Sequence, residues 1–268
     1  MRTIGVFAPT ERTGDDGATL AGLGIAAYLI ADVLHEVVGH GTACLMSGAR
    51  ITLLTSVYFR CSTRTPVIAA AGPTANLVAA GFIWLVQRHR SIAHARVRLL
   101  ILLMFAFNLF WGTGSMVYHS ITNQDDWAIA VADLQPLWLW RVGLVVLGSA
   151  LYVIGIRRVL RSVSGFVAAA DTVSASHRAR RLVLVPYAAA GVAACFAAAF
   201  YTFDPVRAIR EAALEVLASV GVVLPALPNL KLRDVLPPLS HIERSGKWIG
   251  AVAVALVVFT ALLGAGVR

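Results

Sequence analysis

The sequence predicts an all-α polytopic membrane protein with about six transmembrane helices and a short membrane-associated β-strand region after the first helix. Three observations lead to this fold class. Hydrophobic residues make up 58% of the 268 positions. Charged residues make up only 14%, whereas a soluble domain carries about 25%. Apolar runs of about 20 residues recur along the chain, and each is long enough to cross the ~30 Å hydrocarbon core of a bilayer.

The apolar runs divide the chain into three parts. Residues 1–17 form a polar N-terminal segment, residues 18–130 form a membrane core, and residues 131–268 hold the C-terminal transmembrane helices with a long loop at 204–247. The expected transmembrane helices cover residues 18–40, 66–86, 97–119, 137–156, 182–203 and 248–266.

A seventh apolar stretch covers residues 212–227. It holds Glu215 and ends near Pro225 and Pro228. A carboxylate and helix breakers in so short a stretch favour a re-entrant or interfacial helix over a full crossing.

The segment 47–65 differs from the apolar runs on either side of it. Between Ile51 and Phe59 it is rich in β-branched and aromatic residues and has no helical period, which is typical of strands. We expect one or two short strands close to the membrane surface. An open strand edge there could bind an extended peptide by strand addition. The alternative is an ordinary connecting loop.

The net charge of +9 is explained by loops between the apolar runs. Arginines gather in the loops at 88–98 and 157–181, where such residues set topology and contact anionic lipid heads. No nucleic-acid partner is therefore expected. The positive-inside rule places these loops and both termini in the cytoplasm. The Ala- and Arg-rich composition suggests a bacterial source and hence the bacterial cytoplasmic membrane.

The three cysteines do not form a recognisable zinc motif. Cys44, Cys61 and Cys195 are an odd number and match no metal-binding spacing. Cys44 and Cys61 flank the expected strand segment and could pair. The expectation is nevertheless buried, unreactive thiols.

The segment 35–40 (HEVVGH) closes the first apolar run and carries the most informative chemistry. Ionisable side chains at membrane depth usually mark a site or a pathway. Two imidazoles and a carboxylate are the residue types of a zinc hydrolase, in which the histidines bind Zn²⁺ and the acid takes a proton from water. His35 and His40 are therefore candidate ligands, Glu36 is the candidate base, and Zn²⁺ is the expected cofactor.

The spacing of the two histidines leaves alternatives open. At ~100° per residue, side chains five positions apart lie about 140° apart on a regular helix and cannot share an ion. One π-type turn, which Gly39 makes easier, would bring them together. On a regular helix the ligands would instead be Glu36 and His40, with no catalytic base. The remaining alternative is a polar helix end with two solvated histidines.

Two further polar residues are expected near this site. Asp32 precedes His35 by three positions, so it can accept a hydrogen bond from the His35 ring or line a water path to the metal. Asn76 lies in the segment 71–76 (AGPTAN) of the second apolar run and needs a partner at membrane depth. It either joins two helices by a hydrogen bond or contacts the substrate or a developing oxyanion.

These motifs resemble two families of zinc peptidases. The segment 35–40 is similar to the HExxGH motif of the dipeptidyl peptidase III family, in which both histidines bind zinc and the glutamate is the base. Over residues 20–130 the chain resembles the site-2 protease family of intramembrane zinc metalloproteases. That family has a metal motif on one helix, a short strand region, a Gly-Pro-x-x-Asn helix and an Asp ligand on a later helix, and this chain has all four in that order. The resemblance implies a metalloprotease-like core at 18–130.

The resemblance also implies an acidic third ligand beyond the third apolar run. The segment 123–127 (NQDDW) stands there and lacks the usual Asn-Pro and Asp-Gly pairs of the family. Some shorter members are similar in having an Asp-Trp pair, which points to Asp126. Asp125 and His119 are the alternatives, and a solvated acidic loop is another. The family's site usually lies nearer the cytoplasmic face, whereas the charge rule places this end outside the cytoplasm.

The expected function is that of an intramembrane zinc metalloendopeptidase acting on membrane-protein or peptide substrates. His35, His40 and Asp126 would hold zinc, Glu36 would act as the general base, and the substrate would bind as an added strand. Two other functions stay open. One is a non-catalytic relative that binds partners or metal, and the other is a metal or proton transporter.

Overall fold

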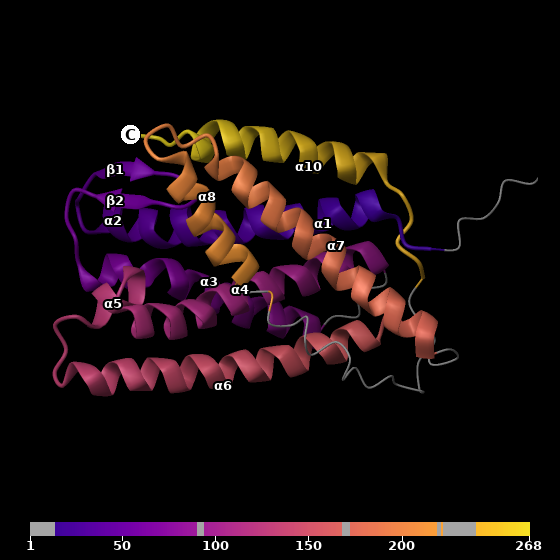
Figure 1. The fold of residues 1–268 in the computed structure, drawn as a ribbon, viewed down its shortest axis with the longest axis horizontal. Coiled ribbons are helices and arrows are strands. Elements are labelled where there is room, and N and C mark those ends of the chain that lie inside the picture. Colours follow the sequence, from indigo (N-terminus) through magenta and orange to yellow (C-terminus); the bar gives the residue numbers. More distant parts are fainter. Residues whose placement is uncertain (1–13, 90–93, 168–171, 219–220, 222–239) are drawn as a thin grey trace, which may run out of the picture.

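The computed structural model describes residues 14–89, 94–167, 172–218, 221 and 240–268. Six helices in this part of the chain are long and apolar enough to cross a membrane. They confirm the predicted all-α polytopic fold and lie side by side in one elongated bundle (Figure 1). They cover Gly17–Met46, Pro66–Arg88, Ala95–Thr122, Leu137–Ser164, Ala175–Ala198 and Gly246–Gly264.

The first crossing combines three helical segments without a break. These are the α-helix α1 (Gly17–Asp32), the π-helix η1 (Val33–Gly41) and the short helix α2 (Thr42–Met46). The strands β1 and β2 follow. The remaining described elements are β1 (Ile51–Leu54), β2 (Phe59–Cys61), α3 (Pro66–His89), α4 (Ala95–Thr122), α5 (Asp125–Val131), α6 (Leu137–Ser164), α7 (Thr172–Ala198), α8 (Pro205–Ala213), η2 (Leu214–Ala218), α10 (Gly246–Phe259) and η4 (Thr260–Gly264).

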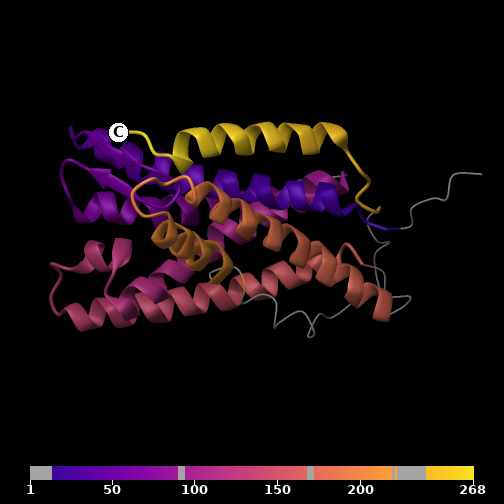
Figure 2. The ribbon, with the colours of Figure 1, turned by 45° about the horizontal axis from the view of Figure 1, so that its top comes forward.

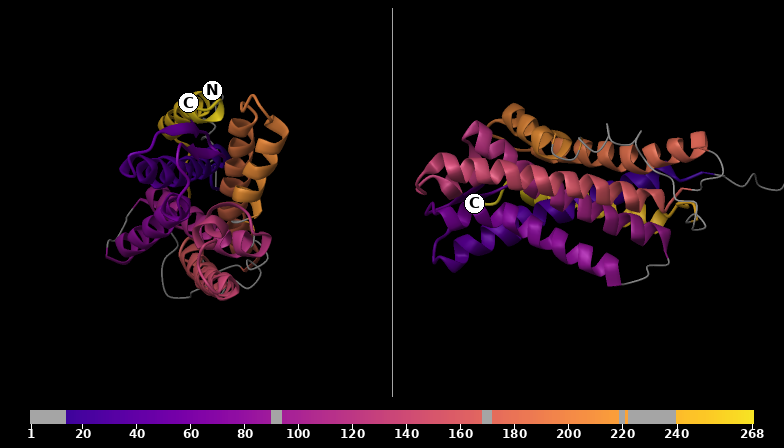
Figure 3. Two further views of the ribbon diagram at one scale, coloured as in Figure 1. Left: turned by 90° about the vertical axis from the view of Figure 1, so that its left-hand side faces the viewer. Right: turned by 90° about the horizontal axis from the view of Figure 1, so that it is seen from below.

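The core of the bundle lies around α1, which contacts α4, α7 and α10. Leu20, Leu23 and Tyr28 of α1 are fully buried there. The helix α10 covers α1 along one side of the bundle (Figure 2). The helix α6 lies on the outside (Figure 3) and packs mainly on α4. A Cβ added at Gly155 of α6 would lie 2.5 Å from Leu109 of α4, so a small residue at this point is what lets the two helices approach.

The strands β1 and β2 form an antiparallel hairpin and confirm the predicted strand region. Leu54 of β1 pairs with Phe59 of β2 on one side. On its other side Leu54 exchanges two backbone hydrogen bonds of 2.9 Å with Val267. The edge of β1 is therefore covered by the end of the chain, and the outer edge of β2 is the edge left for strand addition in the described hairpin.

The cysteine prediction was wrong for two of the three residues. Cys44 of α2 and Cys61 of β2 form a disulfide, with their Cα atoms 6.0 Å apart. The hairpin folds back over the end of the first crossing and brings the two thiols together, although 17 positions separate them. Cys195 is free and half-buried in α7.

The elements α2, β1, β2 and α5 gather at one end of the bundle, called the hairpin end below (Figure 1). Arg268 lies at this end, next to β1, whereas Asp15 lies at the opposite end. Residues 1–13 lie outside the described part of the chain, and the prediction that both termini share one side does not hold for Asp15 and Arg268. The reason is that α7 ends at the hairpin end while α10 begins at the opposite end (Figure 1).

In the chain, the helix α8 and its π-helical continuation η2 come between α7 and α10. They begin at the hairpin end and run back into the bundle against α7. They cover the first part of the seventh apolar stretch, and most of residues 219–227 lie outside the described residues. The long loop predicted at 204–247 therefore begins with a helix.

At the opposite end, Asp15 joins three parts of the chain. Its buried carboxylate forms an ion pair with Arg178 of α7, with contacts of 2.9 and 3.1 Å, and accepts a hydrogen bond of 2.7 Å from the Ile242 N–H. Burial raises the pKa of the Asp15 carboxyl, but the ion pair with Arg178 and the hydrogen bond from the Ile242 N–H lower it by a larger amount. The pKa of Asp15 therefore lies below its ordinary value. A carboxylate of this kind stabilises the fold above its unfolded pKa of about 4, and the effect is lost as the pH falls through the folded pKa.

We expect Asp15→Asn to lower the free energy of unfolding at pH 7 by about 3 kcal/mol, because the substitution leaves Arg178 without its buried partner. The difference from the wild type should shrink as the pH falls below about 4. Chemical unfolding of the detergent-solubilised protein measures both effects. Glu243→Gln, at an exposed acid of the same region, should change neither, and a loss for Asp15→Asn that is constant with pH would contradict the assignment.

Candidate metal centre

The helix that carries both histidines is π-helical over Val33–Gly41. This is the distortion that the five-residue spacing requires, and it brings the Nε2 atoms of His35 and His40 to 3.3 Å from each other. The regular helix on which Glu36 and His40 would be the ligands does not form here. Both imidazoles are buried, with exposed fractions of 4%, so the solvated helix end does not form either.

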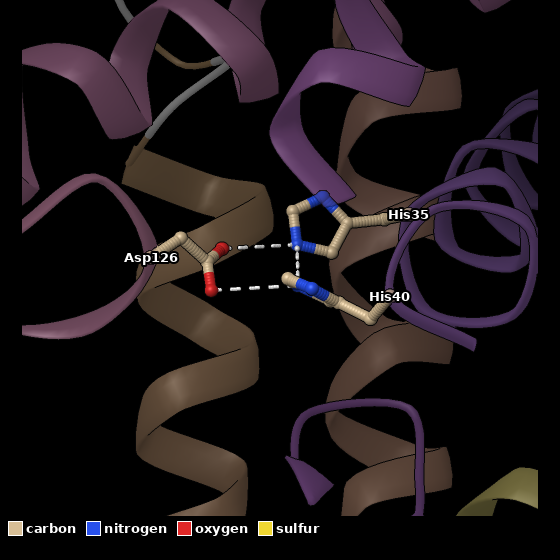
Figure 4. A group of neighbouring side chains, drawn as sticks. All are labelled: His35, His40 and Asp126. Atoms are coloured by element: carbon tan, nitrogen blue, oxygen red, sulfur yellow. Dashed lines mark hydrogen bonds and ion pairs between the residues drawn. The ribbon is translucent and has the colours of Figure 1, made fainter. Parts of the chain in front are cut away.

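Asp126 reaches the two histidines from the first turn of α5. Its Oδ2 lies 3.3 Å from His35 Nε2 and its Oδ1 lies 3.4 Å from His40 Nε2 (Figure 4). One ligand atom from each of the three residues lies within 4.8 Å of the other two. The predicted ligand set is thus brought together from the first crossing and from α5, and it could hold a metal ion.

The turn between α4 and α5 decides which acid enters the site. Asn123 and Asp125 have positive φ angles of 57° and 61°, a left-handed conformation that Asn and Asp tolerate better than most residues. This turn directs Asp126 toward the histidines, whereas Asp125 lines the neighbouring cavity. His119, the other alternative, accepts a hydrogen bond of 3.4 Å from the Trp127 N–H and so supports the turn.

The second ring nitrogen of each histidine already has a partner. His35 Nδ1 lies 2.5 Å from Asn76 Oδ1, and His40 Nδ1 lies 2.7 Å from the Ile68 carbonyl. Both partners are acceptors, so each Nδ1 donates its proton to its partner, and Nε2 is the ring nitrogen of each histidine that faces the other ligands. This is the arrangement that orients histidines for a metal.

The structure corrects the role predicted for Asn76 at the substrate or oxyanion. Its side chain is fully buried. Its Nδ2 donates hydrogen bonds to the Ala31 carbonyl at 3.0 Å and to Asn108 Oδ1 at 2.9 Å, and its Oδ1 faces His35. Asn76 therefore holds α1, α3 and α4 together behind His35, because a buried amide at this depth satisfies its own hydrogen bonds first.

Asp32 also differs from its predicted role. Its Oδ2 accepts a hydrogen bond of 3.3 Å from the Tyr28 hydroxyl, and its Oδ1 has no hydrogen-bond partner in the described part of the chain. Asn76 occupies the position beside the His35 ring that Asp32 was expected to take. Asp32 is fully buried and is not among the residues that line the cavity, so the structure supports neither predicted role.

Two glycines create the space in which the ligands meet. A Cβ added at Gly39 of η1 would lie 2.5 Å from the Gly72 Cα of α3, so the two backbones are in contact. A Cβ added at Gly72 would overlap His40 Nε2 and lie 2.7 Å from His35 Nε2. The room beside the two Nε2 atoms exists only because residue 72 has no side chain.

The donor set fits a metal such as zinc. Two neutral imidazoles and one carboxylate leave a fourth position open, as catalytic zinc sites do. Burial raises the pKa of Asp126, but the hydrogen bonds and positive charge of His40 and His35, which carry Nε2 protons when no metal is bound, lower it by more, so that it lies well below its usual range. The carboxylate is therefore ionised and able to bind a cation.

A cavity of about 1150 Å³ adjoins this group. Its walls come from β2, α3, α4, α5, α6 and the α8–η2 segment. Glu36 lines it, and Glu36 Oε2 has no hydrogen-bond partner in the described part of the chain. Trp111 stacks on His35 and Phe59 of β2 stacks on His40, each with ring centroids 5.2 Å apart. His35, His40 and Asp126, called the metal group below, thus lie at the wall of a space large enough for a peptide segment.

The chain matches no protein-family model, no curated protein and no solved structure.

Residues of the C-terminal half also line the cavity, and the sequence motifs did not identify them. They include Tyr152 of α6, Glu211 of α8 and Glu215 of η2. Burial raises the pKa of Glu215 well above its ordinary value, and the carboxylates of Glu36 and Asp32 raise it further. A glutamate inside an apolar stretch was the signal that could have assigned η2 to the site.

Proposed function

We propose that the protein is an intramembrane zinc metalloendopeptidase that hydrolyses peptide bonds of membrane-embedded substrates. One observation carries the proposal. His35, His40 and Asp126 converge beside the unpaired carboxylate of Glu36, at the wall of a cavity that β2 also lines. The order of motifs that resembles the site-2 protease family, and the strand edge near the ligands, give further support.

His35, His40 and Asp126 are the residues that would hold the metal. A bound zinc ion supplies a Lewis acid that polarises the scissile carbonyl and lowers the pKa of water toward neutrality. Asn76 and the Ile68 carbonyl keep both imidazoles in the tautomer that binds through Nε2.

Glu36 acts as the general base and then as the general acid. It directly follows His35, is 4% exposed, and lines the cavity with Oε2 unpaired. An unpaired carboxylate at this position can accept a proton from the attacking water and deliver it to the leaving amine.

The substrate binds as an extended segment against β2. Phe59 of β2 stacks on His40, so a strand added to this edge would pass close to the metal ligands. A transmembrane helix has to unwind before its backbone can pair in this way, and we therefore expect helix-breaking residues near the cut. The Ala- and Arg-rich composition supports the bacterial cytoplasmic membrane as the location.

The test of this function is Glu36→Gln. The purified protein is incubated with a library of extended peptides, and new N termini are identified by mass spectrometry. We expect the variant to keep its zinc and to lose about 100-fold or more of the cleavage rate, because only the proton acceptor is removed. Glu243→Gln serves as the matched control with wild-type cleavage.

Two results would count against this function. Loss of zinc in Glu36→Gln would make Glu36 a ligand, as in a metal carrier. Zinc-loaded wild-type protein that produces no new N termini from the library would favour a non-catalytic binding protein.

A further inference from the structure

The disulfide lies at the same end of the bundle as the metal group. Cys44 follows His40 by four positions in the chain, and Cys61 ends the strand whose Phe59 stacks on His40. The bridge therefore joins the helix that carries both histidines to the strand that lines the cavity. Disulfides persist in oxidising compartments, whereas the cytosol keeps thiols reduced.

The distribution of charged residues between the two ends of the bundle also indicates that the hairpin end lies outside the cytosol. Near the opposite end, the ends of α3 and α6 and the starts of α4 and α7 carry most of the described arginines, namely Arg88, Arg96, Arg98, Arg157, Arg158, Arg161, Arg178, Arg180 and Arg181. At the hairpin end, the connection from α4 to α6 at 123–136 carries Asp125, Asp126 and Asp133 and no lysine or arginine. In all, the hairpin end carries seven described arginines and the opposite end carries ten, Arg244 included; the seven are Arg50, Arg60, Arg64, Arg141, Arg207, Arg210 and Arg268. Positive residues favour the cytoplasmic side.

From these two independent observations we infer that the hairpin end, with the metal group and the β2 edge, faces the oxidising, non-cytoplasmic side of the membrane. Under the proposed function, on which this part rests, the substrates are membrane-protein segments next to the non-cytoplasmic surface. Such segments reach the β2 edge without crossing the bilayer. The orientation itself does not depend on catalysis.

Cysteine labelling in cells tests the orientation. The full chain carries Cys195→Ala, so that the native bridge is retained and no other native thiol reacts. Asp133→Cys adds one thiol at the hairpin end, and Glu243→Cys adds a matched thiol at the opposite end. Both replace an exposed acid. Intact bacterial spheroplasts are treated with a membrane-impermeant maleimide, and a second sample is treated after the membrane has been opened.

We expect Asp133→Cys to be labelled in intact spheroplasts and Glu243→Cys only in opened membranes. Labelling of Asp133→Cys only after opening, or labelling of Glu243→Cys in intact spheroplasts, would overturn the orientation. In a second measurement, rapid acid quenching and alkylation should modify Cys44 and Cys61 only after chemical reduction. Free thiols at both positions in the cell would overturn the placement on the oxidising side. Neither readout uses cleavage, so a failure of the proposed function would be seen separately.

Discussion

Replacing any one of His35, His40 and Asp126 with alanine is expected to abolish metal binding. The wild-type protein should carry about one zinc per chain, because three protein ligands with one open position are typical of a catalytic zinc site. Each substitution removes one of the three ligands and leaves too few to retain the ion through purification. Elemental analysis of the purified, zinc-reconstituted proteins measures this directly.

Asp125→Asn and His119→Gln provide the controls for this experiment. Asn keeps the tolerance for a positive φ at position 125, and Gln keeps a hydrogen-bond acceptor at position 119. Both residues line the same cavity, but neither belongs to the convergent group, so both variants should keep their zinc. Retention of zinc in His35→Ala would contradict the π-helical site. Loss of zinc in Asp125→Asn together with its retention in Asp126→Ala would show that the turn after α4 presents the other acid.

The second large effect is expected from Gly72→Ala, which adds a single methyl group without replacing a ligand. That methyl would overlap His40 Nε2 and lie 2.7 Å from His35 Nε2. Since α3 and η1 are already in backbone contact at Gly39, the added methyl group can be accommodated only if the two helices move apart. Inserting a methylene into such a packed position typically costs about 1–3 kcal/mol. We expect the zinc content to fall to background and the thermal midpoint to drop modestly.

Gly81→Ala is the matched control for Gly72→Ala. It makes the same substitution in the same helix, where an added Cβ would meet nothing within 4 Å. This variant should keep its zinc and its thermal midpoint. If Gly72→Ala also kept a full complement of zinc, the close approach of α3 to the two histidines would not describe the metal-binding state.

The sequence predicted the parts of the site that depend on local geometry. The five-residue spacing of His35 and His40 is incompatible with a shared ion on a regular helix, so a shared ion required a π-type turn. This was one of the alternatives that the sequence left open, and the chain is π-helical at that point. The six apolar crossings followed from length and composition in the same way. These features depend on neighbouring residues alone.

The structure decided which side chains meet across long sequence separations. Asn76 and His35 are 41 positions apart, and nothing in either helix alone indicated that the amide would hold the ring instead of a substrate. The choice of Asp126 over Asp125 depends on two left-handed residues in one turn. The sequence placed both acids after the third apolar run but did not reveal which of them faces the histidines.

By itself, then, the sequence determined that this protein crosses a membrane about six times and carries a His-Glu-His group at membrane depth. Hydropathy and helical period are properties of short stretches of sequence, so they can be determined without knowledge of the tertiary structure. Only the tertiary structure decided that the Cys44–Cys61 bridge forms, that Gly72 leaves room beside the histidines, and that Glu215 of the C-terminal half lines the same cavity. The physical reason is that each of these depends on how separate helices and strands pack, and the contacts that set this packing lie far apart in the chain.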